Sequence, residues 1–277
     1  MFAVGLFLPA PVGSSSALAA EGGKSAEGGV SLPPTLIIEG ATPATEVEGT
    51  FTTSKSKTER GYGFGLSSVQ YAPVPSFGIK LAIPFAVRDP RDSEPTVGGI
   101  GDVSLMAKYA PLLLHARQFA LSGGVTLTFP TGSERRELGG QFAVAPFLAA
   151  SKGFGPFSLQ ADAAYRWQLN EPRRLEPEED GAEAVRPHKE EGVTANLTVT
   201  YSPVKRLFLI LELTSVTVMR GDEELKERVQ LYVTPSVSVE PAGGWNVRAG
   251  VHLPVTSTKE LDWSLIVIVI VIVTKGF

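Results

Sequence analysis

The sequence predicts an all-β protein, a closed antiparallel up-and-down transmembrane β-barrel of about 12 strands. The first reason is the C-terminal stretch 263–277, WSLIVIVIVIVTKGF, in which nine consecutive residues are apolar and eight of these are β-branched. A membrane-spanning helix needs roughly 20 apolar residues, whereas a tilted spanning strand needs only about 9–11. An apolar strand with a free edge would aggregate in water, and in lipid both of its edges must be paired. We therefore expect the rest of the chain to supply a barrel that this strand closes.

The second reason is an alternation of apolar and polar residues from about residue 45 onward. In the stretch 117–129, for example, Phe119, Leu121 and Leu127 share one parity while Ser122 and Thr126 share the other. Successive side chains of a strand point to opposite faces, so each alternating run predicts one strand. In chain order the predicted strands are 46–53, 61–71, 77–88, 102–109, 117–129, 141–150, 157–168, 193–201, 207–213, 229–239, 245–255 and the terminal strand from 263.

The third reason is the alternation of short and long connections between these runs. The short connections are rich in Pro or Gly and cover 72–76, 110–115, 152–156, 202–205 and 240–244. The longer, charged connections cover 88–99, 131–140, 169–191 and 219–226. Short turns on one side and long loops on the other are typical of an outer-membrane barrel. An even number of strands places both ends of the barrel chain on the short-turn, periplasmic side.

The polar parity distinguishes this barrel from a soluble, lipocalin-like one, which also alternates. A convex surface in water would be dense in Lys, Glu and Arg. Here the polar parity is mostly Gly, Ala, Ser and Thr, which suit a crowded interior, so the large apolar residues are expected to face lipid. Aromatic residues that share the apolar parity fall near strand ends, where an interfacial girdle would lie. They are Tyr109, Tyr165, Trp167, Tyr201, Trp245 and Trp263.

Both parities of the terminal strand are apolar. Its valines are expected to face lipid, which leaves Ile266, Ile268, Ile270 and Ile272 facing inward. These isoleucines would either pack against something inside the barrel, such as the N-terminal stretch 36–38, or give the lumen an apolar wall. The chain ends on Phe277, which we interpret as a membrane-insertion signal, although Lys275 occupies a position that is usually apolar or aromatic in such signals.

The N-terminal region reads as a leader followed by a linker. Residues 1–20 resemble a secretory signal peptide, with an apolar stretch at 2–9 and the small-residue pattern Ala17-Leu18-Ala19-Ala20 before Glu21. The basic start of such a peptide is missing, so we expect a truncated one; a disordered leader rich in Ala, Ser and Gly is the alternative. Residues 21–44 are expected to form a flexible arm, and 45–277 the outer-membrane barrel.

Composition excludes several functional classes. The 277 residues carry 25 Lys+Arg against 29 Asp+Glu, a net charge of −4 that gives no reason to expect nucleic acid as a partner. The absence of cysteine excludes disulfides and thiolate metal or redox sites. No cofactor and no metal site are predicted, because the acidic loop 169–191 is more typical of a solvated outer loop than of a cation site.

Charged residues of the inward parity are the candidate functional residues. We expect them either to form a polar constriction of mixed sign that controls solute passage, or to pair across the lumen and fill it. These candidate lumen-lining residues are Lys80, Arg88, Asp102, Lys108, Asp162, Arg166, Glu212, Arg248 and His252.

A catalytic reading depends on His252, since His115 and His188 fall in connections. An outer-membrane lipid hydrolase would need a nucleophile beside this histidine, and Ser236 or Ser238 on the preceding strand could come within reach. These serines share the inward parity, away from lipid, and no G-x-S-x-G motif occurs. We therefore predict a protein that is not an enzyme and has no catalytic residues.

Two segments resemble a known family. The stretch 98–112, GGIGDVSLMAKYAPL, is similar to a Gly-x-Gly-Asp segment that runs into a strand ending in Lys-Tyr, and 127–133, LTFPTGS, is similar to a Pro-Thr-Gly segment before an outer loop. Both resemble the phenol meta-degradation pathway family of outer-membrane proteins, over most of the chain from about residue 45. The resemblance implies an outer-membrane barrel acting in transport of small hydrophobic or aromatic compounds, with no catalytic residues.

The predicted function is thus transport or diffusion of small, hydrophobic or aromatic solutes across the outer membrane of a Gram-negative bacterium. A structural or adhesive barrel with a blocked lumen is the alternative, and a lipid hydrolase is a third. The expected partners are membrane lipids, the outer-membrane assembly machinery and a small-molecule solute.

Overall fold

The computed structural model describes residues 39–56, 59–90, 95–133, 138–170, 191–220, 227–241, 243–257 and 262–272. The predicted signal peptide, the stretch 36–38, His188 with residues 171–190 of the acidic loop, and Phe277 lie outside these ranges. The strands are β1 (Glu46–Lys55), β2 (Glu59–Val74), β3 (Phe77–Ala82), β4 (Phe85–Pro90), β5 (Val97–Ile100), β6 (Val103–Leu114), β7 (Phe119–Phe129), β8 (Ala143–Phe154), β9 (Phe157–Gln168), β10 (Glu191–Val204), β11 (Leu207–Arg220), β12 (Val229–Val239), β13 (Trp245–Pro254) and β14 (Trp263–Ile272).

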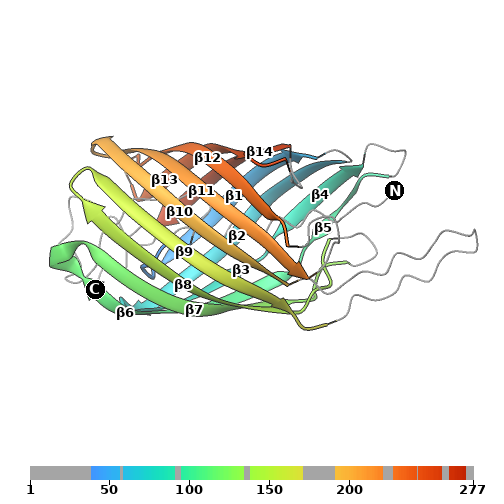
Figure 1. Ribbon diagram of the computed structural model, residues 1–277, viewed down its shortest axis with the longest axis horizontal. Coiled ribbons are helices and arrows are strands. Elements are labelled where there is room, and N and C mark those ends of the chain that lie inside the picture. Colours follow the sequence, from blue (N-terminus) through green and yellow to red (C-terminus); the bar gives the residue numbers. More distant parts are fainter. Residues whose placement is uncertain are drawn as a thin grey trace, which may run out of the picture.

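One antiparallel sheet closes on itself to form a barrel (Figure 1). The terminal strand β14 pairs with β13 on one edge and with β1 on the other, as the sequence predicts. The β1–β14 ladder runs from Glu46 opposite Ile272 to Lys55 opposite Trp263, so the apolar terminal strand has no free edge. Among the described strands, each except β5, which pairs only with β4, has a partner on both edges, and such pairing is the condition for a sheet to cross a bilayer.

The wall has 12 strands although 14 strand segments are present. β3 and β4 both pair with β2 and are separated only by Ile83 and Pro84, so together they form one strand of the wall. β5 and β6 are likewise separated only by Gly101 and Asp102. Proline has no N–H to give to the ladder, which explains an interruption at Pro84. The predicted number of twelve strands is therefore confirmed. The predicted strand 77–88 is broken at Pro84, and the predicted connection 88–99 is partly wrong because β5 begins within it.

Short turns gather at one end of the barrel, on the left of Figure 1, and the strand ends that the longer connections join lie at the other. The short-turn end includes the 3₁₀ turn η1 (His115–Arg117) between β6 and β7. It also includes the turn between β8 and β9, in which Gly155 has a φ of +60°. A left-handed φ of this kind is cheap only for glycine. In the described part of the chain, no helix has the length and apolar character needed to cross a membrane.

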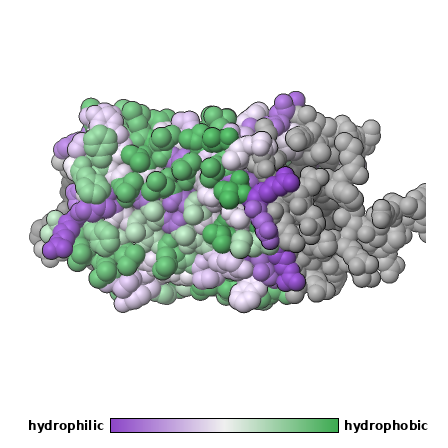
Figure 2. All heavy atoms as spheres, viewed as in Figure 1, coloured by the Kyte–Doolittle hydropathy of each residue, from purple (hydrophilic) through white to green (hydrophobic). Residues whose placement is uncertain are grey.

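The outer surface of the wall is apolar. Ile79, Leu81 and Ile83 are exposed, while Lys80 between them is buried, so the apolar parity faces outward. Figure 2 shows apolar side chains spread over the middle of the barrel wall. A soluble barrel would bury this parity instead. The large apolar surface therefore identifies a barrel that sits in lipid, with the faces as predicted.

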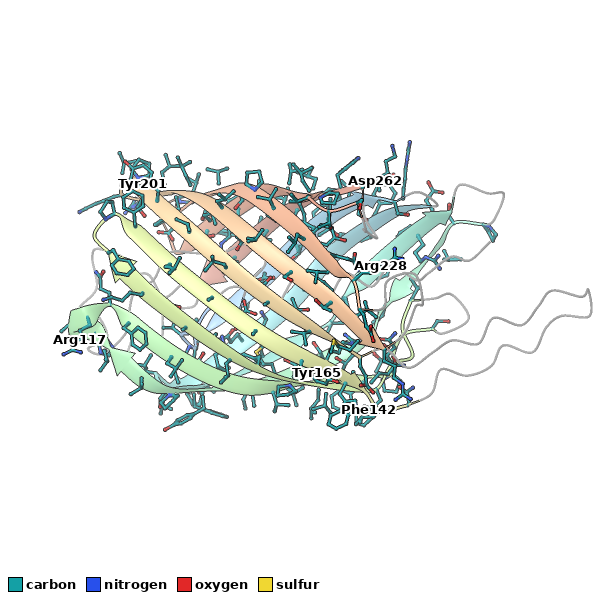
Figure 3. The ribbon with its side chains drawn as sticks, viewed as in Figure 1. Arg117, Phe142, Tyr165, Tyr201, Arg228 and Asp262 are labelled. Atoms are coloured by element: carbon teal, nitrogen blue, oxygen red, sulfur yellow. The ribbon has the colours of Figure 1, made fainter. Side chains whose placement is uncertain are left out.

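Aromatic residues lie on the outer surface near both ends. Tyr109, Tyr201 and Trp245 are exposed at the short-turn end, and Trp167 and Trp263 at the long-loop end. Figure 3 shows Tyr201 and Tyr165 at opposite ends of the barrel. Tyr201 also stacks on Phe157 of the neighbouring strand, with ring centroids 4.9 Å apart. This arrangement matches the two aromatic girdles of outer-membrane barrels.

Candidate functional site: the barrel interior

The predicted lumen-lining residues lie on the buried face of the wall. Six are almost fully buried and come from four strands, β3, β6, β11 and β13, and from the junction of β5 and β6: Lys80, Asp102, Lys108, Glu212, Arg248 and His252. The other three, Arg88, Asp162 and Arg166, are half-buried. Because the opposite face of each strand is exposed and the sheet is closed, the buried face is the interior of the barrel. The interior is thus rich in charged and polar groups.

A short segment of chain, residues 39–44, lies inside the barrel. All six of its residues are buried. Ala41 packs against Ala120 of β7 and Ala149 of β8. Pro43 lies close to Gly78 of β3: a Cβ added to this glycine would be 3.0 Å from the Cβ of Pro43. These contacts reach the inner face of several strands. We call residues 39–44 the internal segment; it occupies part of the interior just before β1 begins.

Glu39 of the internal segment joins two predicted lysines. The Lys108 ammonium donates to Glu39 Oε1 and to the carbonyl of Gly40, the latter at 2.7 Å. The Lys80 ammonium lies 3.6 Å from Glu39 Oε2. Lys80 and Lys108 come from the paired strands β3 and β6, and their side chains converge on one carboxylate. The N–H of Glu39 also donates to Asp162 on β9, so this residue connects three parts of the wall.

Asp102 binds a loop rather than another charged side chain. Its Oδ1 accepts the N–H groups of Gly132 at 2.9 Å and Gly140 at 2.8 Å, and its Oδ2 accepts that of Gln141 at 2.8 Å. Thr131 lies beside it and accepts the N–H of Val103 through Oγ1. Asp102 thus ties both ends of the β7–β8 loop to the junction of β5 and β6. This geometry gives Asp102 a positioning role at the long-loop end.

Arg248 belongs to a polar network near the short-turn end. Its Nε donates to Asn246 Oδ1 at 2.6 Å, and Asn246 Nδ2 donates to Ser238 and to Glu240, each at 3.1 Å. Glu240 lies in the turn after β12, outside the spanning strands. Burial raises the pKa of its carboxyl, while the hydrogen bond from Asn246 and the charge of Arg248 oppose that rise.

The remaining acidic candidates have uncharged partners on neighbouring strands. Glu212 accepts a hydrogen bond from the Thr198 hydroxyl at 3.3 Å, and Asp162 accepts from Asn196 Nδ2 at 3.1 and 3.2 Å. Arg166 donates to Gln141 Oε1 at the long-loop end. These three residues therefore have partners outside the Lys80–Glu39–Lys108 bridge.

His252 has a threonine partner. Its Nδ1 lies 2.8 Å from the Thr234 hydroxyl, and its ring stacks on Tyr232 with centroids 4.4 Å apart. Ser238 is hydrogen-bonded to Asn246, and Ser236 lies opposite Gly250 in the ladder, so neither predicted serine pairs with His252. The nucleophile–base pair that a lipid hydrolase needs is not formed by these residues.

The terminal strand contributes an apolar row to this polar interior. Ile266, Ile268 and Ile270 form a cluster of buried residues, and the last two are 0% exposed. The predicted inward orientation of these isoleucines is confirmed, while the side chain of Ile272 falls outside the described part. In the ladder Ile268 lies between Thr50 and Arg248, and Ile270 between Glu48 and Asn246. The isoleucine row is thus one strand wide and flanked by polar groups.

Four buried acids of the described chain were not among the predicted residues: Glu39, Glu46, Glu48 and Glu240. Glu46 and Glu48 alternate with Val47 on β1, so the same parity rule applied to this strand would have found them. In the ladder, Glu46 lies opposite Gln70 of β2, which in turn lies opposite Lys80 of β3. Glu39 precedes the first strand and carries no periodic signal, so only the three-dimensional structure reveals it.

Sequence comparison places the chain in a family. Residues 27–261 match the family model described as "Putative MetA-pathway of phenol degradation". The chain belongs to this family. The two segments that resemble family motifs meet in the structure, where Thr131 and Gly132 bond to the chain at Gly101 and Asp102. None of the curated proteins compared with the chain matches it.

Solved outer-membrane barrels superpose on this chain. The COG4313 outer membrane channel from Pseudomonas putida F1 superposes with a TM-score of 0.67 at 14% identity, covering 83% of this chain and 96% of that one. NanC porin gives 0.55 at 10% identity over 83% and 100% of the two chains. KdgM porin, solved with disordered oligogalacturonate, gives 0.52 at 11% identity over 83% and 99%. The chain thus has the fold of bacterial outer-membrane porins and channels, in accord with its apolar outer wall.

Proposed function

We propose that this barrel is a channel for small solutes of the outer membrane, and that its solutes combine an apolar part with a polar one. The observation that carries the proposal is the composition of the interior. Charged groups from most of the wall share it with the isoleucine row of β14. A purely structural barrel needs no such mixture, whereas a channel for amphiphilic solutes needs both kinds of surface. The family and the fold support an outer-membrane channel, and the mixed interior is the observation that suggests the class of solute.

The predicted lumen-lining residues would act in this channel in two ways. Lys80, Lys108, Arg248 and Glu212 are at most 5% exposed, so they would present their charges to a solute only when the interior opens, for example by movement of the internal segment. Asp102 would hold the β7–β8 loop in place at the entrance on the long-loop side. Insertion by the assembly machinery would depend on the C-terminal Phe277, and deletion of this residue should lower the amount of folded barrel in the outer membrane.

Solute flux through the purified barrel tests the proposal. Liposomes containing the protein would be exposed to small solutes that differ in polarity: an aromatic alcohol, an aromatic acid and a neutral sugar of similar size. We expect faster entry of at least the aromatic solutes than in protein-free liposomes, measured by stopped-flow swelling. Protein that has been inserted but heat-unfolded serves as the control. Flux equal to the control for every solute would refute the channel.

A barrel with a blocked lumen is a second candidate, and one observation favours it. The internal segment crosses the interior and is held by buried contacts with β3, β6, β7 and β8. If this segment never moves, the barrel would serve only as a scaffold for its outer loops. Removing residues 39–44 and measuring solute flux distinguishes the two candidates. A channel should pass solutes in the intact protein, whereas a scaffold should pass them only in the deletion variant.

A further inference from the structure

We propose that Lys80 and Lys108 form a carboxylate-binding site in the barrel interior, which the chain itself occupies with Glu39 and which carboxylate-bearing solutes enter by displacing Glu39. The proposal names a solute class for the channel and in that sense rests on the function proposed above. Its starting point is the convergence of two ammonium groups from neighbouring strands on a single carboxylate. A carboxylate that bridges two buried cations is the arrangement expected of a bound anionic ligand.

The two lysines are built into the wall and are not surface side chains. Lys108 is 2% exposed and Lys80 is 5% exposed. Burying two ammonium groups side by side costs free energy unless an anion lies between them. Glu46 and Glu48 on β1 interact electrostatically with Lys80, but the carboxylate closest to both lysines is that of Glu39. The wall therefore supplies the cations, and a separate piece of chain supplies the anion.

The internal segment is attached to the wall in a way that permits exchange. Between Glu39 and the start of β1 it consists of Gly40, Ala41, Thr42, Pro43 and Ala44, whose small side chains bury little apolar surface. Among the interactions described for this segment, those that involve charge are made by Glu39 and by the carbonyl of Gly40. The described charged contacts of this segment with the wall are therefore concentrated at Glu39 and Gly40.

Glu39 fills the site incompletely. Its Oε1 is bonded to Lys108, whereas its buried Oε2 is ion-paired with the Lys80 ammonium at 3.6 Å, longer than an ordinary hydrogen bond. A carboxylate oxygen buried without a hydrogen bond is costly. A free carboxylate is not constrained by a chain backbone and can place one oxygen against each lysine. A small carboxylate can therefore compete with Glu39 although Glu39 is covalently present.

Binding of benzoate to the purified barrel in detergent tests the site without requiring transport. Benzamide serves as the uncharged probe of nearly equal shape. In the Glu39→Gln variant the internal competitor loses its charge while its volume is kept, so we expect benzoate to bind roughly tenfold more tightly than to the wild type by isothermal titration calorimetry. Benzamide binding should change by less than about twofold. Glu191→Gln, which removes one charge at the rim of the wall, should leave the preference for benzoate as in the wild type.

The lysines are tested by variants that keep or remove the charge. Lys108→Met should abolish the preference for benzoate over benzamide in the Glu39→Gln background, and Lys108→Arg should retain part of it. If Lys108→Met does not fold, the comparison of Glu39→Gln with the wild type still decides the matter. Equal gains for benzoate and benzamide in Glu39→Gln would show that the variant merely loosens the interior, and would overturn the proposal, as would no gain for either.

The outcomes separate this site from the channel function. Tight benzoate binding without flux of any solute through liposomes would refute the channel but leave the carboxylate site standing. Flux of neutral aromatic solutes without charge-dependent binding of benzoate would support the channel and refute the site. In a functional channel with this site, benzoate flux should rise in Glu39→Gln relative to benzamide flux.

Discussion

The loop anchor at Asp102 gives the sharpest structural prediction. Its carboxylate accepts three backbone N–H groups from Gly132, Gly140 and Gln141 at 2.8–2.9 Å. A hydrogen bond to a charged group contributes about 1.5–3 kcal/mol net, so three of them at the low end come to about 4.5 kcal/mol. Asp102→Ala removes all three and leaves the N–H groups without this acceptor. We therefore expect the β7–β8 loop to open about a thousandfold more often, since 1.4 kcal/mol corresponds to a factor of about ten.

Asp102→Asn should give a smaller effect for a geometric reason. The amide oxygen can replace Oδ1 and keep the bonds from Gly132 and Gly140, but the amide nitrogen would then face the N–H of Gln141, donor against donor. We expect a loss of about 1.5–3 kcal/mol in the stability of the closed loop, from one lost bond and the lost charge. The fraction of molecules with an open loop should thus increase from the wild type to Asp102→Asn and again to Asp102→Ala.

Limited proteolysis measures this opening. The sequence places Arg135 and Arg136 between the two anchored ends, so trypsin reports on the loop, and the rate of cleavage follows the open population when closing is fast. Cleavage at these arginines, assigned by mass spectrometry, should be at least about a hundredfold faster in Asp102→Ala than in the wild type. Asp89→Asn, which alters a carboxylate with one hydroxyl donor at the same end, is the matched control. Cleavage of Asp102→Ala at the wild-type rate would refute the anchor.

Three further predictions concern the wall. Gly124→Ala would place a Cβ 2.2 Å from the carbonyl oxygen of Ala107 and 2.7 Å from the Phe147 ring, so urea unfolding should show a loss of at least about 1–3 kcal/mol. Val269→Arg puts a charge on the lipid-facing side of β14 and should cost about 2–4 kcal/mol in folding into bilayers, whereas Val269→Leu should be nearly neutral. The raised pKa of Glu240 means that the folded state binds its proton more tightly, so this residue's contribution to stability falls as pH rises above the ordinary carboxyl range. The free energy of unfolding of Glu240→Gln should therefore increase relative to that of the wild type as the pH is raised from 5 to 8. A difference between the two free energies that does not change with pH would contradict this.

The wall of the barrel could be predicted from sequence because its signals are periodic. Alternation in runs such as 77–88 assigned the faces, and the exposure of Ile79 and Leu81 beside the burial of Lys80 confirms them. The pairing of β14 with both β13 and β1 followed from the need to leave no apolar edge. What the pattern missed was local. Pro84 interrupts one strand without changing its parity, whereas the parity shifts by one position at Gly101, because both Ile100 of β5 and Leu105 of β6 face outward.

The contents of the interior were only partly predictable. Parity identifies which side chains point inward but not which of them meet across the lumen. The bridge from Glu39 to Lys80 and Lys108 joins residues 41 and 69 positions apart, and no short-range pattern encodes such a contact. The three N–H groups on Asp102 come from a loop whose conformation alternation does not describe. Parity alone assigns Lys80, Lys108 and Asp102 alike to the lining of the pore. Their partners differ: the two lysines bind the carboxylate of Glu39, and Asp102 anchors the β7–β8 loop.

The terminal strand presents a problem of register that the structure resolves. A one-residue shift normally exchanges the apolar and polar faces of a strand, but the alternating Val and Ile of β14 would exchange one apolar face for another at little cost. The start of the strand removes this ambiguity. Trp263 is exposed on the outer surface, and Ser264 is 0% exposed and donates to the carbonyl of Thr53 at 3.3 Å. A shift would turn the tryptophan inward and the serine toward lipid, so these two residues set the register that aims the isoleucine row at the lumen.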